Sequence, residues 1–239
     1  MRTIRTLGAA ALAGVLALSI ALPAAASGSG DGKVRVFHNS PDTPAVDIYA
    51  NGALVPGLTG VTFGTVSSYL SLPKGTYTFE VKVSPSTPAA PAALTAAVTL
   101  GNRPLTVAAI GSLTGNGAPL QARVYQDRSG VGGNLALLRV AHTSPNAPAV
   151  DVQLRIGKLW VPVIRNLSFG ETAGYLPLPA NVPFASDPIK YDFRVVAAGT
   201  SNVVLSLPGT TLPRNAAVTV WAVGFLGTNF GAQVTVDGR

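Results

Sequence analysis

A long sequence motif occurs twice in this chain of 239 residues, and this repeat constrains the fold more than any other feature. The segment 35–48, RVFHNSPDTPAVDI, returns at 139–152 as RVAHTSPNAPAVDV, with nine of the fourteen positions identical. Agreement of this extent does not arise by chance. The folded part of the chain is therefore expected to consist of two copies of one folding unit.

The repeat continues beyond this motif, in the same order in both halves. Segments 63–64, 69–73, 77–81 and 105–111 match 169–170, 175–179, 191–195 and 218–224. The spacing between the matches is unequal, because each half carries its own Pro- and Ala-containing insertion, 84–93 in the first and 180–188 in the second. Insertions fall where the backbone is exposed and where function often lies, so we expect partner recognition in these insertions rather than in the repeated motif.

Apolar residues alternate with polar ones at the period of a β-strand. Tyr77, Phe79, Val81 and Val83 are separated by single polar residues, and Gly- or Pro-containing turns divide such segments from one another. About seven short strands per hundred residues predict an all-β protein with two tandem immunoglobulin-like antiparallel β-sandwich domains. We expect the domains at 33–127 and 136–239, joined by a Gly-rich linker at 128–135 with few contacts between them, so that each half folds alone.

The N-terminus has the three parts of a secretory signal peptide. Arg2 and Arg5 precede an apolar stretch at 7–22, and Ala24-Ala25-Ala26 offers a small-residue cleavage site. We expect residues 1–26 to be removed, the alternative being an uncleaved membrane anchor. No later apolar stretch is long enough to cross a membrane, which predicts a secreted or envelope-associated protein.

Composition excludes several classes of function. The chain has no cysteine, so disulfides, thiol catalysis and cysteine-bound metals are excluded. The net charge is +7, or +5 without Arg2 and Arg5, and it shows no run of adjacent Lys or Arg. A nucleic-acid-binding protein concentrates its positive charge into a patch, so no nucleic acid is expected as a partner.

The repeated motif itself is typical of a rigid turn that opens a hairpin. Pro41 restricts its own backbone, Asp42 can accept hydrogen bonds within the turn, and Pro44 suits the start or edge of a strand. Arg35 is on the strand before the turn and Asp47 on the strand after it, which predicts that they pair across the sheet. We expect all the motif residues to be structural: Arg35, His38, Ser40, Asp42, Asp47, Arg139, His142, Ser144, Asn146 and Asp151.

Two functional interpretations of the motif stay open at this point. His38, Asp42 and Asp47 could supply an imidazole and two carboxylates to a metal, although the second copy has the neutral Asn146 in place of one carboxylate. Ser40, His38 and Asp47 could serve nucleophilic catalysis, but no Gly-x-Ser-x-Gly segment presents the serine. We therefore expect no catalytic residue, no metal site and no cofactor.

Aromatic residues that occur in only one copy are the remaining candidates for binding. Trp221 lies in an apolar strand and is expected in a core, whereas Trp160 is either core or an exposed contact residue. Phe184 lies in the insertion of the second half, bounded by Pro183. Trp160 and Phe184 are the predicted binding residues, since exposed aromatics anchor sugars and protein partners.

The motif RVxHxSPDxPAVD, followed by Phe-Gly, by YLxLP and by GTYTFEV, resembles the bacterial family named domain of unknown function 4397. The resemblance covers both halves and implies a secreted or envelope-associated β-sandwich module, often in tandem, with no activity assigned. We therefore expect a non-enzymatic protein that binds an envelope polysaccharide or another extracellular protein. The alternative is an extracellular enzyme or a metal-dependent carbohydrate-binding module.

Overall fold

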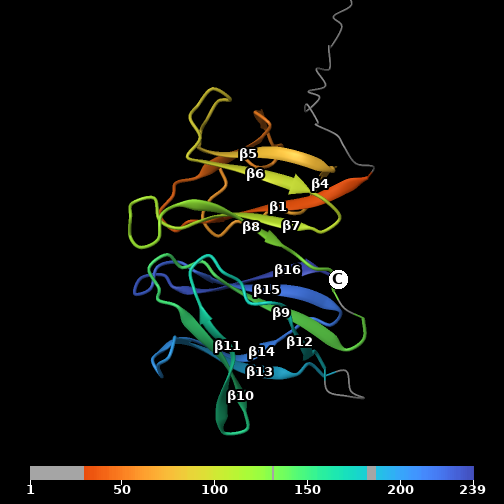
Figure 1. Ribbon diagram of the computed structural model, residues 1–239, viewed down its shortest axis with the longest axis vertical. Helices are drawn as coiled ribbons and strands as arrows, with labels where there is room; N and C mark the ends of the chain where they lie inside the picture. Colours follow the sequence, from red (N-terminus) through yellow and green to blue (C-terminus); the bar gives the residue numbers. More distant parts are fainter. Residues whose placement is uncertain (1–29, 131, 182–186) are drawn as a thin grey trace, which may run out of the picture.

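The computed structural model describes residues 30–130, 132–181 and 187–239, and every regular element in them is a β-strand. Four sheets of four strands each stack as layers, two per domain (Figure 1). The predicted all-β class with two β-sandwich domains is confirmed. The expected signal peptide, 1–26, lies outside the described residues.

The first domain comprises strands β1 to β8. Its inner sheet, which faces the second domain, has the order β4 (Leu70–Pro73), β1 (Asp31–Asn39), β7 (Leu105–Ile110), β8 (Gln121–Gln126). Its outer sheet has the order β3 (Ala53–Leu54), β2 (Val46–Ala50), β5 (Gly75–Val83), β6 (Leu94–Leu100).

The second domain repeats this topology strand for strand. Its inner sheet has the order β12 (Leu176–Pro179), β9 (Leu135–His142), β15 (Ala216–Val223), β16 (Gly231–Gly238). Its outer sheet has the order β11 (Leu159–Leu167), β10 (Val150–Ile156), β13 (Lys190–Ala197), β14 (Val203–Thr211). Each strand of the first domain thus has its counterpart eight strands later, as the sequence repeat predicts.

Strand register supports the duplication at the level of single residues. Leu105 of β7 lies opposite Val34 of β1, and Val218 of β15 lies opposite Leu138 of β9. Both pairings are parallel, whereas the other strand pairs are antiparallel. The prediction of purely antiparallel sheets is therefore wrong in one pair per domain, because local alternation does not tell which strand will lie beside β1.

Each domain has an apolar core between its two sheets. In the first domain Val34 and Val36 of the inner sheet pack with Ile48 and Phe79 of the outer sheet. In the second domain Leu138 and Val140 pack with Val152 and Phe193 in the same way. The period-2 alternation predicted from the sequence is thus the alternation between core and outside.

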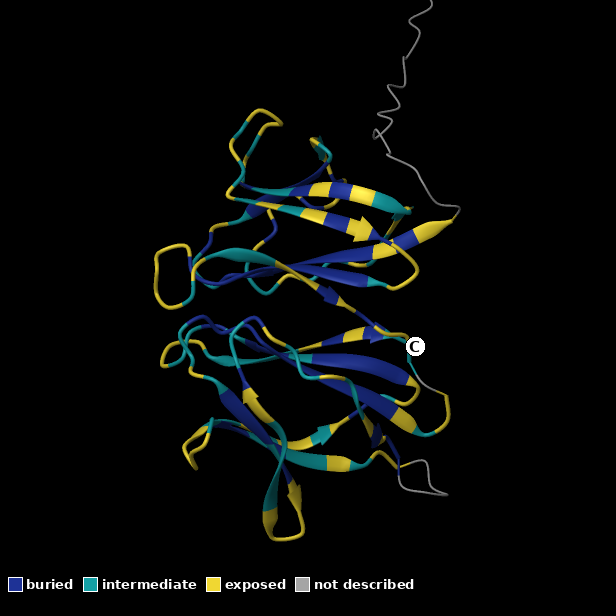
Figure 2. Cartoon of the chain, in the orientation of Figure 1, coloured by how far each residue is buried: buried dark blue, intermediate teal, exposed yellow. Residues whose placement is uncertain are grey.

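A third apolar cluster lies between the domains. Trp221 of β15 is fully buried and makes edge-to-face contacts with Phe37 of β1 and Tyr125 of β8, each with ring centres 5.1 Å apart. Figure 2 shows the central strands of the two inner sheets mostly buried, at the middle of the stack. The expectation of few contacts between the halves is therefore wrong. Trp221 is indeed a core residue, although its core joins two domains.

The interface predicts that Trp221 stabilises the whole molecule. Trp221→Ala would open a cavity between the inner sheets and is expected to lower the free energy of unfolding by about 3–5 kcal/mol. Val234→Ala is the control, because Val234 lies on the neighbouring strand β16 and is 58% exposed. We expect a change of less than about 0.5 kcal/mol there. Urea denaturation measures both, and equal effects would contradict a shared interdomain core.

Candidate functional site

The two histidines close the motif turns. His38 lies just before its turn, and its Nε2 is 3.1 Å from the carbonyl oxygen of Pro44. In the second copy, Nε2 of His142 is 2.9 Å from the carbonyl oxygen of Pro148. Both rings are buried. Burial lowers the pKa of both imidazoles, although the hydrogen bonds to the carbonyls act in the opposite direction. Each ring is therefore held neutral inside its domain, where it bridges two parts of the turn.

Asp42 ties its turn to the loop between β7 and β8. Its carboxylate accepts hydrogen bonds from the Ser112 hydroxyl at 2.7 Å, the Leu113 amide at 2.9 Å and both the amide and hydroxyl of Thr114. Burial by itself raises the pKa of Asp42, but these hydrogen bonds outweigh it and hold the pKa well below its usual range. The carboxylate is thus engaged within its own domain.

The second copy has Asn146 at this position, and the structure explains the exchange. Its side-chain oxygen accepts from the Leu226 amide at 2.7 Å, while its side-chain nitrogen donates to the Leu226 carbonyl at 3.2 Å. The loop in the second domain presents a donor and an acceptor, which an amide satisfies and a carboxylate would not. The Asp-to-Asn difference follows the partner loop and keeps the same structural role.

The motif serines bind the glycine that ends the neighbouring central strand. Ser40 donates to the carbonyl of Gly111 at 2.7 Å, and Ser144 donates to that of Gly224 at 2.6 Å. Gly111 has φ +97°, and a Cβ there would lie 2.2 Å from the Pro119 carbonyl oxygen. The serine hydroxyl is therefore directed at the backbone, so it is not presented to a general base. The catalytic interpretation of Ser40 and His38 has no support from this geometry.

Asp47 and Asp151 hold loops against the outer sheets. Asp47 accepts from the Gly60 amide at 2.8 Å and from the amide and hydroxyl of Ser86, both at 2.8 Å. Asp151 accepts from the amides of Asn166 and Gly199. Burial alone would raise the pKa of Asp47, but its hydrogen bonds lower it overall. Among the residues that the structure describes, no three His, Asp or Glu side chains gather where they could hold a metal.

Arg35 and Arg139 do not pair with Asp47 and Asp151, so this prediction is wrong. Arg35 of the first domain instead forms an ion pair with Asp237 of the second, and its Nη1 donates to the Val236 carbonyl at 2.8 Å. Asp47 faces the outside of its domain, whereas Arg35 points from the inner sheet towards the other domain. Period-2 reasoning placed the two on adjacent strands but did not show that those strands belong to different sheets.

The second domain makes the reciprocal contact. Arg139 donates from Nη2 to Asp127 of the first domain at 2.5 Å and from Nη1 to the Gln126 carbonyl at 2.6 Å. The side chains of both arginines are 4% exposed, and those of Asp127 and Asp237 are fully buried. Two cations and two carboxylates thus form a neutral, crossed group between the domains, which we call the interdomain network.

Threonine and tyrosine side chains complete the interdomain network. Around Asp127, the Thr106 hydroxyl accepts from Nε of Arg35 and donates to the carboxylate, and the Tyr69 hydroxyl donates to the same carboxylate. Around Asp237, the hydroxyls of Thr219 and Tyr175 donate to the carboxylate in the same way, and Thr219 accepts from Nε of Arg139. Burial raises the pKa of Tyr69 far above its usual value, and the Asp127 charge adds to this.

Sequence reasoning did not identify Asp127 and Asp237 as network residues. Both lie at the end of the last strand of their domain, three residues after a valine, in V-Y-Q-D and V-T-V-D. This shared position was the available signal. Asp127 is the last residue before the expected linker at 128–135.

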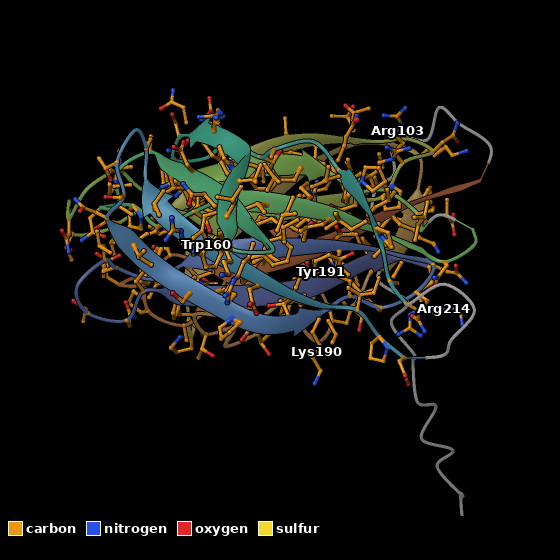
Figure 3. All side chains as sticks on the ribbon, turned by 90° about the horizontal axis from the view of Figure 1, so that it is seen from below. Arg103, Trp160, Lys190, Tyr191 and Arg214 are labelled. Atoms are coloured by element: carbon orange, nitrogen blue, oxygen red, sulfur yellow. The ribbon has the colours of Figure 1, made fainter. Side chains whose placement is uncertain are left out.

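Trp160, the first predicted binding residue, lies on the edge strand β11 of the outer sheet in the second domain and is partly exposed (Figure 3). The guanidinium carbon of Arg194 lies 4.4 Å from the centre of a Trp160 ring, and Arg194 Nε donates to Gln153 at 2.8 Å. At the adjacent hairpin tip, Ile156 is 58% and Leu159 is 70% exposed. Phe184, the second predicted binding residue, lies outside the described residues.

The corresponding outer sheet of the first domain is covered by its own insertion. Ser86, in segment 84–93, accepts from the Tyr49 hydroxyl at 3.2 Å through its carbonyl, and the Pro88 carbonyl accepts from Lys82 at 2.6 Å. Lys82 lies 4.6 Å from the Tyr49 ring centre and is 2% exposed. The first insertion thus folds back onto the sheet.

The model of the family described as "Domain of unknown function (DUF4397)" matches residues 32–153, and the chain belongs to this family. The resemblance seen in the motif is thereby confirmed. No curated protein matches the chain. None of the described residues forms a helix long and apolar enough to span a membrane.

Solved structures with some likeness include two fimbrial proteins from Porphyromonas gingivalis. The tip fimbrial protein Mfa3, with a C-terminal truncation, is 11% identical, with 87% of this chain and 100% of that chain covered and a TM-score of 0.29. The fimbrial anchor protein Mfa2 is 9% identical, with coverages of 87% and 98% and a TM-score of 0.21. Scores this low carry no argument about the function of this chain.

The interdomain network predicts which charges are energetically coupled. In a double-mutant cycle, Arg35→Met and Asp237→Asn are expected to be non-additive by about 0.5–3 kcal/mol. Each single variant should cost about 3–5 kcal/mol, because it leaves a buried charge without its partner. Arg35→Met and Asp47→Asn, the pair predicted from the sequence, should be additive within about 0.5 kcal/mol. Coupling in the second cycle and none in the first would contradict the structure.

The buried histidines predict a loss of stability in mild acid. The unfolded chain binds protons near the ordinary pKa of 6.5, whereas the folded pKa is lower. The stabilisation is therefore complete above about pH 6.5 and is lost as the pH falls from there towards the folded value. The double variant His38→Asn, His142→Asn removes both histidines of the chain. Urea midpoints at pH 7 and pH 5 should differ less in this variant than in the wild type, and an equal difference would refute the assignment.

Proposed function

We propose that this protein is a secreted or envelope-associated, non-enzymatic binding module, and that it contacts its partner through the outer sheet of the second domain around Trp160. The observation that carries the proposal is the contrast between the two outer sheets. In the first domain the sheet is covered by segment 84–93, which buries Lys82. In the second domain the hairpin of β10 and β11 leaves Trp160, Ile156 and Leu159 accessible.

The chemistry around Trp160 suits recognition of a sugar or of a protein surface. Its indole provides a flat apolar face, and the stacked Arg194 and the amide of Gln153 place hydrogen-bonding groups beside that face. Arg155 and Asp192, whose side chains lie 3.5 Å apart and are 51% and 37% exposed, add donors and acceptors. Aromatic and arginine side chains dominate the energetics of many binding surfaces.

The motif residues do not enter this proposal, because their polar groups serve the fold. The carboxylate of Asp42 holds a loop, the hydroxyl of Ser40 is bound to a backbone carbonyl, and the imidazole of His38 closes its turn. A binding module needs no reactive group. The side chains that we propose for binding lie on the outer sheet of the second domain. Envelope polysaccharide is the partner that we place first, and an extracellular protein is the second.

Trp160→Ala is expected to weaken binding to insoluble envelope polysaccharide at least about tenfold, as loss of a central aromatic contact does. Co-sedimentation with that polysaccharide measures the affinity. Leu54→Ala is the matched control, since Leu54 is 42% exposed on the edge strand of the other outer sheet. We expect both variants to keep the wild-type melting temperature. Unchanged binding in Trp160→Ala, or equal losses in both variants, would refute the site.

A further inference from the structure

The exposed positive charge of this protein is concentrated at one end of the molecule. Without Arg2 and Arg5, the chain has fifteen Lys and Arg residues and ten Asp and Glu residues. The end at which the domains are joined carries the exposed residues Lys33, Arg103, Arg128, Lys190, Arg214 and Arg239, against the exposed acids Asp31 and Asp187. We call these six cations the basic end.

Strand topology places the basic end where the central strands of both inner sheets begin. In the first domain β1 and β7 begin there and β8 ends there, because Val34 lies opposite Leu105, and Leu105 lies opposite Gln126. In the second domain β9 and β15 begin there and β16 ends there, as shown by the pairings Ala216 with Ala136 and Ala217 with Gly238. Arg103, Arg128, Arg214 and Arg239 flank these strand ends in the sequence.

The two domains touch at this end, which brings their cations together. A Cβ on Gly130 would lie 2.0 Å from the carbonyl oxygen of Asn215, next to Arg214 in the sequence. A Cβ on Gly238 would lie 2.8 Å from Cα of Ser129, next to Arg128. In Figure 3, Arg103 and Arg214 both lie towards the right-hand end, and in Figure 1 the C-terminus lies at the junction of the domains.

An open groove, made of two hollows that share Arg103 and Arg128, lies beside these two cations of the basic end. One part, of about 550 Å³, is lined by Arg103, Arg128 and the backbone of 129–130. A second part, of about 300 Å³, shares Arg103 and Arg128 and extends along the domain boundary to Arg139 and Tyr175. The groove therefore follows the seam between the domains, and its lining includes the exposed Arg103 and Arg128 and the buried Arg139, which is paired with Asp127.

Within the described part of the chain, Arg103 and Arg128 form no ion pair. Arg103 donates to the neutral side chain of Gln126 at 3.2 Å, and Arg128 lies 5.9 Å from the ring centre of Tyr175. The ion pairs found within residues 30–130, 132–181 and 187–239 involve other basic residues. Asp127 also lines the groove, but its carboxylate is fully buried and is bound by Arg139.

We propose that this groove binds a linear polyanion, a polymer with phosphate or carboxylate groups repeated along a flexible chain. Guanidinium groups bind both anions through paired hydrogen bonds. Exposed cations on both sides of the seam would contact successive anionic groups, whereas a flat surface could not enter the groove. This site is separate from the outer sheet around Trp160, and it assigns a function to the net charge that the sequence leaves unexplained.

The test measures binding of fluorescently labelled linear polyphosphate and polyglutamate to the chain lacking residues 1–26, at about 50 mM and 300 mM salt. We expect binding of at least one polymer, weakened strongly by the added salt. Arg103→Gln with Arg128→Gln should lower the affinity about tenfold or more at the lower salt. The matched control, Arg123→Gln with Arg165→Gln, removes the same charge from exposed arginines outside the groove and should change the affinity by less than about threefold.

Preference for one polymer identifies the anionic group, and Trp160→Ala should bind the polymers as the wild type does, which separates this proposal from the proposed function. Equal losses in the two double variants would overturn the groove in favour of a general charge effect. Absence of binding to both polymers would overturn it outright. Binding to vesicles of anionic and zwitterionic phospholipid without binding to either soluble polymer would assign the basic end to a membrane surface instead.

Discussion

The crossed ion pairs between Arg35 and Asp237 and between Arg139 and Asp127 determine how the two halves of this protein fit together. Each arginine leaves its own inner sheet and finds its carboxylate at the last strand of the other domain. A buried charge without a partner is strongly unfavourable. A shift of one domain against the other would therefore break these ion pairs as well as the apolar contacts between the inner sheets. The interdomain network therefore specifies one relative placement, and the cluster around Trp221 fills the space beside it.

This arrangement explains why the two copies agree at some positions and differ at others. The agreement falls on residues that the fold uses twice, such as the serine bound to Gly111 or Gly224 and the tyrosine bound to Asp127 or Asp237. Some differences fall on residues whose contacting loop also differs, as with Asn146 and the loop at Leu226. Other differences fall on the outer sheets. There one copy is covered by its own insertion, whereas Trp160 in the other copy is partly exposed.

The repeat predicted the fold well because strands alternate locally. The equivalence of Leu105 with Val218 follows from residue order alone and agrees with the strand register. The structural role of the motif stays a prediction from turn chemistry, and the contacts of the two histidines with Pro44 and Pro148 support it. The candidate site was harder to predict. Trp160 could be named as an aromatic without a counterpart. Its exposure depends on the length of a hairpin and on the short turn 198–202 between β13 and β14, where the first copy has the covering segment 84–93, and a local pattern contains neither.

The sequence by itself determined that this chain is a duplicated all-β protein, that its motif forms turns, and that disulfides play no part in its stability. Those properties depend on local periodicity, on proline and glycine, and on composition. Only the tertiary structure decided that Arg35 binds Asp237 instead of Asp47, that Trp221 joins two domains, and that the cations of distant segments meet at one end. Each of these depends on residues that lie far apart in the sequence, because the layers of the stack are built from segments that are not neighbours in the chain.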